Sequence, residues 1–366
     1  MDILTKTANN VRILAASMVE RAKSGHPGGA MGGADFVSAL YAKYLDYDPT
    51  DPHWIARDRF FLDPGHMSPM LYSILALTGK YTLEELQQFR QWDSPTPGHP
   101  ELDVERGVEN TSGPLGQGHV MAVGCAIAER FLVARFGDVV AHKTFAFISD
   151  GGIQEEISQG AGRLAGHLGL ANLIMFYDSN NVQLSTDCDA VTTEDTAAKY
   201  RSWKWNVLEV DGTDPDALCR AIEAARAEKS RPSIIIGHTV MGRGCVTAEG
   251  EPWEGKCSTH GQPISKAGAD YAATIRNLGG DAENPWVIFD DVKALFAARE
   301  AELKELAAQN LDSARDRLTD ILCNYKGAVD FDVIVVFDAY KVKGRSSSSE
   351  KNINITVVYT GENETA

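Results

Sequence analysis

The chain has 366 residues, long enough for about two domains, and 43% of them are hydrophobic, which supports a large core. A net charge of −16 argues against a nucleic-acid-binding surface, and no apolar run is long enough to span a membrane. The first residues lack the features of a signal peptide, and six scattered cysteines without a CxxC pair favour reduced thiols in a cytoplasmic protein.

The first predicted helix ends at a loop that carries a histidine. Apolar residues recur at helical spacing over residues 3–22, and the pattern stops at SGHPGG, residues 24–29. Gly25 and Pro27 flank His26 and predict a tight loop rather than a helix face. For His26 alone, a buried loop histidine held by backbone carbonyls is the simpler interpretation.

Two more histidines lie on predicted loops. A helix is predicted for residues 34–44, followed by a short strand, FFL at 60–62, which stops at DPGH and leaves His66 on a turn. Residues 93–102 hold three prolines and His99, which indicates an ordered loop of the kind that lines binding sites.

The stretch GPLGQG at residues 113–118 is glycine-rich and comes just before an apolar helix predicted for residues 120–136. Glycine lets the backbone approach a ligand, and the amides at a helix amino terminus favour anions. On its own this stretch is weak evidence, because simple helix entry explains it equally well.

Residues 144–186 contain the strand–helix–strand unit around which the rest of the chain is organised. An apolar strand at 144–148 ends in SDGG, predicted as a turn, and a helical pattern at 153–168 leads to a second strand at 173–177. Asp150 and Asn180 each follow a strand and are expected at the carboxyl edge of a sheet. Carboxylate, amide and carbonyl oxygens suit Mg²⁺, although each piece alone is also an ordinary turn.

Alternation of strands and helices continues beyond this unit. Strands are predicted at 207–210 and 233–238, with a helix between them that is capped by Thr213 or Asp214 and runs to about residue 229. The predicted fold class is therefore α/β, a parallel sheet with helices on both faces.

Five motifs together resemble transketolase, and they occur in that family's order around the Asp-Gly…Asn signature of thiamine diphosphate enzymes: SGHPGGAMGGAD at 24–35, DPGHMSPMLYS at 63–73, TPGHPE at 96–101, GPLGQG at 113–118 and STHGQP at 258–263. The similarity covers the family's amino-terminal, diphosphate-binding part, from about residue 9 to residue 300. His26, His99 and GPLGQG separate this resemblance from pyruvate-dehydrogenase-type subunits.

The resemblance implies thiamine diphosphate and Mg²⁺ as cofactors, and it assigns a role to each matching residue. Mg²⁺ would be held by Asp150, Asn180 and the backbone carbonyl of Val182, and the cofactor would be bound by Gly151, His66 and Asn180, with its aminopyrimidine against Gly113 and Leu115. Glu155 would be a buried acid that supports the metal loop and a subunit contact. His26, His99 and His260 would bind the sugar hydroxyls and transfer protons. The other histidines are interpreted as structural or exposed: His53, His119, His142, His167 and His238.

Some positions depart from the family's pattern. Ser149 stands where many members have glycine, and Met67 stands in the diphosphate loop where a small residue is common. The larger departure is that nothing after residue 300 resembles the family's second half, which carries the glutamate that activates the aminopyrimidine and the arginines that bind the sugar phosphate.

The predicted domains are residues 1–300, closed by a charged helix at 290–309, and a tail of residues 301–366. The tail resembles the middle of a YacP-type NYN ribonuclease domain, in AELKELAAQNLDSARDRLTDILCNYKG, VIVVFDAYKVKG and ITVVYTGENETA. It lacks the opening strand with that fold's catalytic aspartate, and Asp338 alone matches an acidic position. We expect an incomplete α/β module without nuclease activity.

The resemblance implies transfer of a two-carbon ketol unit between sugar phosphates, by a homo-oligomer or with a chain that carries the second half. The alternatives are an inactive binding or scaffolding chain, and an RNA-processing protein that works through its tail. The complete set of cofactor motifs argues against the RNA-processing alternative, and neither a membrane nor a nucleic acid is expected as a partner.

Overall fold

The computed structural model of the chain describes residues 2–325, 332–337 and 355–360, with side chains described through residue 314. The chain divides into two compact units, Met1–Glu305 and Leu306–Ala366. Asp338 and residues 345–352 of the predicted tail lie outside the described residues. In the part that is described, no helix is long and apolar enough to cross a membrane, and the five described cysteines are free.

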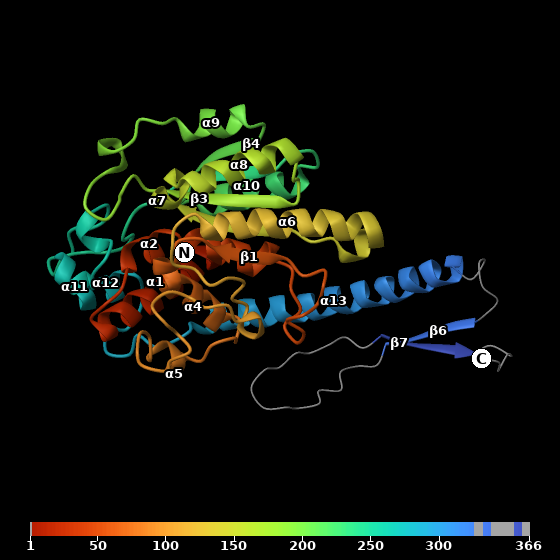
Figure 1. Cartoon of the computed structure of the whole chain (residues 1–366). Helices are drawn as coiled ribbons and strands as arrows, with labels where there is room; N and C mark the ends of the chain where they lie inside the picture. Colours follow the sequence, from red (N-terminus) through yellow and green to blue (C-terminus); the bar gives the residue numbers. More distant parts are fainter. Residues whose placement is uncertain (1, 326–331, 338–354, 361–366) are drawn as a thin grey trace. The chain divides into compact units, whose positions relative to one another are not determined.

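A five-stranded parallel sheet forms the centre of the first unit, with strand order β1-β2-β3-β5-β4 (Figure 1). The α/β fold class predicted from the sequence is confirmed. The strands are β1 (Arg59–Leu62), β2 (Thr144–Ser149), β3 (Leu173–Ser179), β4 (Asn206–Asp211) and β5 (Ser233–His238). Each predicted strand is present, and most of them extend one or two residues beyond the prediction.

Helices cover both faces of this sheet, because successive strand residues point to opposite sides. Phe145 and Phe147 of β2 pack in one cluster and Ala146 and Ile148 in the other. The first cluster includes α1 (Ile3–Ala22), α3 (Ala34–Ala39), α4 (Ser68–Leu77) and α10 (Pro215–Ala227). The second includes α6 (Gln117–Phe136), α8 (Glu156–Leu168) and α9 (Thr196–Ser202).

Smaller elements complete the first unit. A third cluster joins α1 to the short helices α11 (Ile264–Ala267) and α12 (Tyr271–Asn277). The remaining short helices are α2 (Pro27–Gly32), α5 (Leu83–Leu86) and α7 (Asp150–Gln154), with a π-helical turn at Leu40–Tyr44 and 3₁₀ turns at Gly65–Met67, Val104–Arg106, Asp138–Val140, Cys188–Ala190 and Cys257–Thr259.

Two glycine-rich stretches predicted as loops or turns are helical instead. α2 begins directly after His26, and α7 begins at Asp150, capped by the Ser149 hydroxyl, which accepts a hydrogen bond from the Gly152 N–H at 3.4 Å. A Cβ at Gly28 would come within 2.6 Å of the Thr259 carbonyl oxygen, so this glycine permits a close approach rather than a turn.

Three smaller predictions also need correction. The helix predicted for residues 34–44 is α3 followed by the π-helical turn, and the pattern at 153–168 is interrupted at Glu155, where the extended backbone separates α7 from α8. Asp214, not Thr213, caps α10, and it accepts a hydrogen bond from the Asp216 N–H at 2.9 Å.

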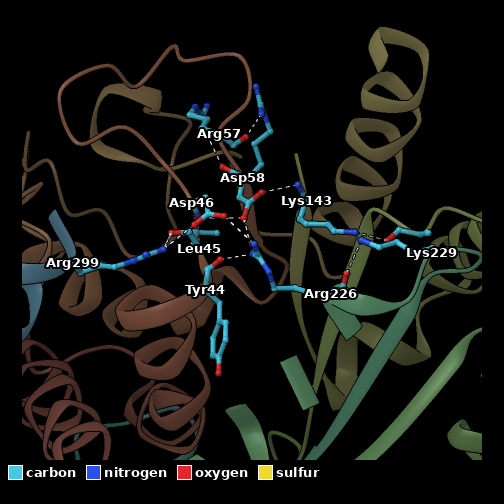
Figure 2. Close-up of polar contacts among 11 residues, drawn as sticks. Tyr44, Leu45, Asp46, Arg57, Asp58, Lys143, Arg226, Lys229 and Arg299 are labelled. Carbon is cyan, nitrogen blue, oxygen red and sulfur yellow. Dashed lines mark hydrogen bonds and ion pairs between the residues drawn. The ribbon is translucent and has the colours of Figure 1, made fainter. Parts of the chain in front are cut away.

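A network of charged side chains around the buried Asp58 lies at the amino-terminal edge of the sheet (Figure 2). Asp58, directly before β1, accepts hydrogen bonds from the Arg226 guanidinium at 3.2 Å and from the Lys143 N–H at 2.6 Å. Asp46 accepts from Arg226 at 2.9 Å and from Arg299 at 2.9 Å. Burial and the nearby Asp46 raise the pKa of Asp58 to about 6, and Arg226 opposes this shift.

The second unit contains most of one long helix and a two-stranded sheet. Helix α13 (Asp290–Tyr325) begins in the first unit and is longer than the predicted 290–309. Strands β6 (Asp332–Phe337) and β7 (Ile355–Thr360) pair antiparallel, with Asp332 opposite Thr360. The domain boundary placed at residue 300 stays a prediction.

Candidate functional site

The two residues predicted as the centre of the site meet at the carboxyl edge of the sheet. Asp150 directly follows β2 and Asn180 directly follows β3, and these parallel strands are neighbours with Ser149 opposite Asp178. The Asn180 N–H donates a hydrogen bond to Asp150 Oδ2 at 3.1 Å. The residues that follow two neighbouring strands therefore lie in contact and form one polar group.

Asp150 is buried and is held by a tyrosine that the sequence analysis did not single out. The Tyr177 hydroxyl donates to Asp150 Oδ1 at 2.5 Å. Burial raises the pKa of Asp150, and the hydrogen bonds from Tyr177 and from the Asn180 backbone offset part of this rise. These contacts keep the carboxylate in one position at the end of β2.

Two hydrogen bonds, one to each end of the amide group, fix the orientation of the Asn180 side chain. Its Nδ2 donates to Asp178 Oδ2 at 3.1 Å, and its Oδ1 accepts from the Val182 N–H at 3.0 Å. Asp178 is fully buried, and its Oδ1 accepts a hydrogen bond from the Thr239 hydroxyl. Burial raises the pKa of Asp178 to about 7, and the Thr239 hydroxyl opposes this rise.

Four histidines from four separate loops form a cluster. The ring centroid of His26 lies 5.1 Å from that of His66, 6.5 Å from that of His99 and 5.8 Å from that of His260. The rings of His66 and His260 are stacked, with centroids 5.4 Å apart. These are the four histidines that the resemblance singles out, and the structure brings all of them together.

All four imidazoles are shifted toward the neutral form. Burial lowers the pKa of His26 to about 4, with contributions from His260, Arg90 and His99. The pKa of His66 is well below its ordinary value for the same reason, and burial also lowers the pKa values of His99 and His260. Neutral imidazoles can each donate one hydrogen bond and accept another, so the cluster can bind a ligand's hydroxyl groups.

The cluster contains polar atoms without a partner. Nδ1 of His26 and Nδ1 of His260 are buried and make no hydrogen bond. Buried polar atoms of this kind cost free energy unless a ligand or water satisfies them. A Cβ at Gly261 would lie 3.4 Å from His26 Cδ2 and 3.3 Å from Leu184 Cδ1, which places the loop after Asn180 beside the histidines.

The glycine-rich loop at 113–118 lies against the metal-binding candidates. A Cβ at Gly151 would come within 2.9 Å of Leu115 Cδ1, and no atom lies within 4 Å of a Cβ built at Gly113. Asp63, fully buried at the end of β1, accepts hydrogen bonds from the Gly116 N–H at 3.0 Å and the His119 N–H at 3.2 Å. The ends of β1, β2 and β3 and this loop therefore share one edge of the sheet.

The residues present fit a Mg²⁺-bound diphosphate cofactor. The donor set has hard oxygens on Asp150 and Asn180, the cluster has two unsatisfied imidazole nitrogens, and the position of a Cβ at Gly113 is open, with no atom within 4 Å. Val182 is buried next to Asn180. Within the described residues no three or more His, Cys, Asp or Glu side chains could hold a metal by themselves, so phosphate oxygens or other ligands would have to complete the coordination.

Glu155 differs from its expected environment. It is exposed in the chain, at the junction between α7 and α8, whereas the resemblance implies a buried acid. Its assignment to a subunit contact stays a prediction, because a partner chain would change its burial. Of the histidines interpreted as structural or exposed, His119 and His142 are buried, and His167 and His238 are exposed.

The sequence analysis missed the residues that hold these groups in place. Tyr177, Asp178 and Thr239 lie at strand ends, and Asp63 was quoted only as part of a motif. Polar residues at the carboxyl end of an otherwise apolar strand are the signal that could have found Tyr177 and Asp178.

Comparison with known proteins shows the family of this chain. Residues 3–317 match the family described as transketolase, thiamine diphosphate binding domain. The chain belongs to this family. It is 44% identical over 299 residues to transketolase 2 of Escherichia coli strain K12, covering 80% of this chain and 44% of the relative. It is 43% identical over 295 residues to transketolase 2 of Xanthobacter flavus, covering 79% of this chain and 42% of the relative.

Solved transketolase structures share the fold. Transketolase from Leishmania mexicana matches with a TM-score of 0.80 and 35% identity, covering 90% of this chain and 48% of that one. The enzyme from Campylobacter jejuni gives a TM-score of 0.80 and 34% identity, covering 94% of this chain and 53% of that one. Residues 297–366 match a second family, the YacP-like NYN domain, as the tail resemblance predicts. The chain spans less than half of the curated relatives that it matches.

Proposed function

We propose that this chain is the thiamine diphosphate- and Mg²⁺-binding part of a transketolase, which transfers a two-carbon ketol unit from a ketose phosphate to an aldose phosphate. The convergence of His26, His66, His99 and His260 carries this proposal, because the four come from four separate loops and none has an ordinary pKa. Family membership and the neighbouring Asp150–Asn180 pair support it.

The proposed roles follow the chemistry of each group. Asp150, Asn180 and the carbonyl of Val182 hold Mg²⁺, which binds the diphosphate, while His66 and the Gly151 backbone contact the diphosphate itself. Leu115 and Gly113 contact the aminopyrimidine. Bound thiamine diphosphate would supply the nucleophilic thiazolium carbon.

The remaining histidines act on the substrate. His26, His99 and His260 hydrogen-bond the hydroxyls of the donor sugar and transfer protons near its carbonyl. Their lowered pKa values keep them neutral at pH 7, so each can accept a proton or a hydrogen bond without first losing one. Arg90, which adds to the lowering of the His26 and His99 pKa values, is a positive group beside this cluster.

The complete reaction needs a chain that carries the family's second half, and the chain itself is expected to form a homo-oligomer or a complex with that partner. The surface of α6 and α8 favours such a partner because it exposes apolar side chains: Val120, Met121, Ile127, Phe131, Ile157, Leu164 and Leu168. A groove of about 640 Å³ lies between these helices. α6 begins at the glycine-rich loop and α8 follows α7, which begins at Asp150, so a partner on this surface would lie beside the proposed cofactor site. The free cysteines are compatible with a cytoplasmic enzyme.

Binding is the direct test. Isothermal titration of the full chain with thiamine diphosphate should show binding that requires Mg²⁺, and Asp150→Ala should abolish it. Asp270→Ala, which removes the cap of α12 elsewhere in the unit, serves as the control and should leave the affinity within about twofold. Unchanged affinity in Asp150→Ala would refute the metal assignment.

Activity separates the proposed function from its alternatives. Ketol transfer from xylulose 5-phosphate to ribose 5-phosphate should be negligible for the chain alone and should appear when an isolated transketolase second half is added. Binding without rescue would favour a scaffolding chain. Magnesium-dependent RNA cleavage that requires Asp338 would favour the RNA-processing alternative.

A further inference from the structure

The amino terminus of α6 is held by a carboxylate from a different strand. Its N-cap residue, Gly116, has a positive φ of 86° and no side chain to accept hydrogen bonds from the first turn. The initial N–H groups of a helix have no partner within the helix and are usually satisfied by a side chain at the cap. Here Asp63 supplies the acceptor from the end of β1.

Asp63 holds both ends of the glycine-rich loop at once. Its two carboxylate oxygens take different amides, Gly116 N–H at 3.0 Å and His119 N–H at 3.2 Å. At the other end of the loop, the Ser112 hydroxyl donates to the backbone carbonyl of Asp63 at 2.6 Å. We call Asp63, with its hydrogen bonds to Gly116, His119 and Ser112, the clamp. The Asp63 N–H donates to the Phe147 carbonyl of β2 at 3.0 Å, so the clamp is anchored on the sheet.

Neighbouring glycines allow this arrangement. A Cβ at Gly118 would come within 2.6 Å of Asp63 Cα, and a Cβ at Gly152 would overlap Asp63 Oδ2. No Lys, Arg or His side chain in the described residues forms an ion pair with Asp63. The buried charge therefore depends on the backbone amides and on the positive end of the α6 dipole.

We propose that Asp63 is a positioning residue that fixes the loop at 113–118, and through it the face that the aminopyrimidine of the cofactor contacts. The loop reaches the metal-binding side through Leu115, whose Cδ1 lies against Gly151. The identity of the ligand rests on the proposed function, whereas the clamp itself rests only on the hydrogen bonds of Asp63.

The test is Asp63→Asn in the full chain. An asparagine has the same shape but only one acceptor oxygen, so one of the two amides would face an NH₂ group. Amide hydrogen exchange at Gly116 and His119 should accelerate at least tenfold, while the amides of β2 keep their protection. In Mg²⁺, the affinity for thiamine diphosphate should fall about tenfold, and the affinity for inorganic pyrophosphate, which lacks the aminopyrimidine, should change less than twofold.

Two further variants keep the result interpretable. Asp270→Asn makes the same change at the cap of α12, where it should not alter exchange at Gly116 or affinity for the cofactor. Ser112→Ala removes only the hydroxyl bond at the other end of the loop, and it decides the question if Asp63→Asn does not fold: it should produce a smaller change in the same direction.

The outcomes separate this proposal from the proposed function. Unchanged exchange at Gly116 and His119 in the folded variant would overturn the clamp, as would an equal loss of pyrophosphate and thiamine diphosphate affinity. A wild-type chain that binds no thiamine diphosphate would refute the proposed function, and the exchange measurement would still decide the role of Asp63.

Discussion

Strand β1 has a buried aspartate at each end, and the partners of the two differ. Burial raises the pKa of both Asp58, before the strand, and Asp63, after it, to about 6. Asp58 belongs to a network with Arg226 and Asp46. Asp63 accepts hydrogen bonds from backbone amides alone.

The difference extends along the two edges of the sheet. At the amino-terminal edge, arginines balance the buried Asp58 and the partly exposed Asp46. At the carboxyl edge, Asp63, Asp150 and Asp178 are all buried, and in the described part of the chain none of them pairs with a Lys or Arg side chain. A raised pKa therefore does not by itself identify the site, since structural ion networks also perturb pKa values. What differs between the two edges is the Lys or Arg partner, which Asp63, Asp150 and Asp178 lack among the described residues, and a divalent metal at Asp150 would bring a positive charge to the second edge.

The largest expected effect comes from breaking the amino-terminal network. Arg226→Met would leave Asp58 buried without its guanidinium partner, and we expect the free energy of unfolding to fall by about 2–4 kcal/mol. Chemical denaturation measures this loss. Arg226→Lys keeps the charge but loses the planar fork, so its loss should be smaller. Thiamine diphosphate affinity should stay within about twofold, and a selective loss of affinity would contradict the division between the two edges.

A smaller effect is expected at the carboxyl edge, and there it should appear in metal binding rather than in folding. Thr239→Val removes the hydroxyl that donates to Asp178, and with it one of the groups that hold the carboxylate against the Asn180 amide. Groups that orient metal ligands typically contribute about 10–100-fold in affinity. We expect the affinity for Mg²⁺ in the presence of thiamine diphosphate to fall about tenfold, as measured by titration calorimetry.

The matched control for this change is Thr239→Ser, which keeps the hydroxyl and loses the methyl group. It should bind Mg²⁺ almost as the wild type does. Equal losses in the valine and serine variants would show that the Thr239 methyl, which approaches Gly212, matters as much as the hydrogen bond.

The sequence predicted the elements of the sheet and the positions of the ligand candidates, because both depend on local patterns. Apolar runs give the strands, and Asp150 and Asn180 lie at strand ends where the prediction placed them. The glycines of α2 and α7 suggest turns in the sequence, but in the fold they serve another purpose: the lack of a side chain lets another segment of the chain pack closely against them. Gly28 faces the Thr259 backbone and Gly152 faces Asp63, and neither neighbour is close in sequence.

The same limit explains the missed positioning residues. Asp63 and its amide partner Gly116 are 53 residues apart, and Thr239 and Asp178 are 61 residues apart. Nothing in the spacing of either pair indicates contact. Each aspartate looks like an ordinary residue at the end of a strand until the fold brings its partner to it.

The smallest effect concerns the pH dependence of stability at Asp63, where the two ends of β1 can be compared most directly. The folded-state pKa of about 6 lies above the ordinary 3.8, because burial disfavours the charge and Glu155 adds repulsion, while the amides of Gly116 and His119 oppose the rise. At pH 7 the carboxylate is ionised in both the folded and unfolded states, and the folded state bears the full free-energy cost of burying the charge. As the pH falls through 6 the folded protein takes up a proton that the unfolded chain does not, so the free energy of unfolding rises.

Between pH 7 and pH 5 this single group should add about 1 kcal/mol to the stability of the wild type relative to Asp63→Asn, which cannot titrate there. Other groups that titrate in this range, such as Asp58 and Asp178, cancel in that difference because both proteins contain them. Tyr200, whose own pKa is raised by burial and by Asp63, stays neutral throughout. Denaturation of both proteins across this pH range measures the difference. A constant difference would mean that Asp63 titrates near its ordinary pKa, and the amides of α6 would then offset the effect of burial on its charge.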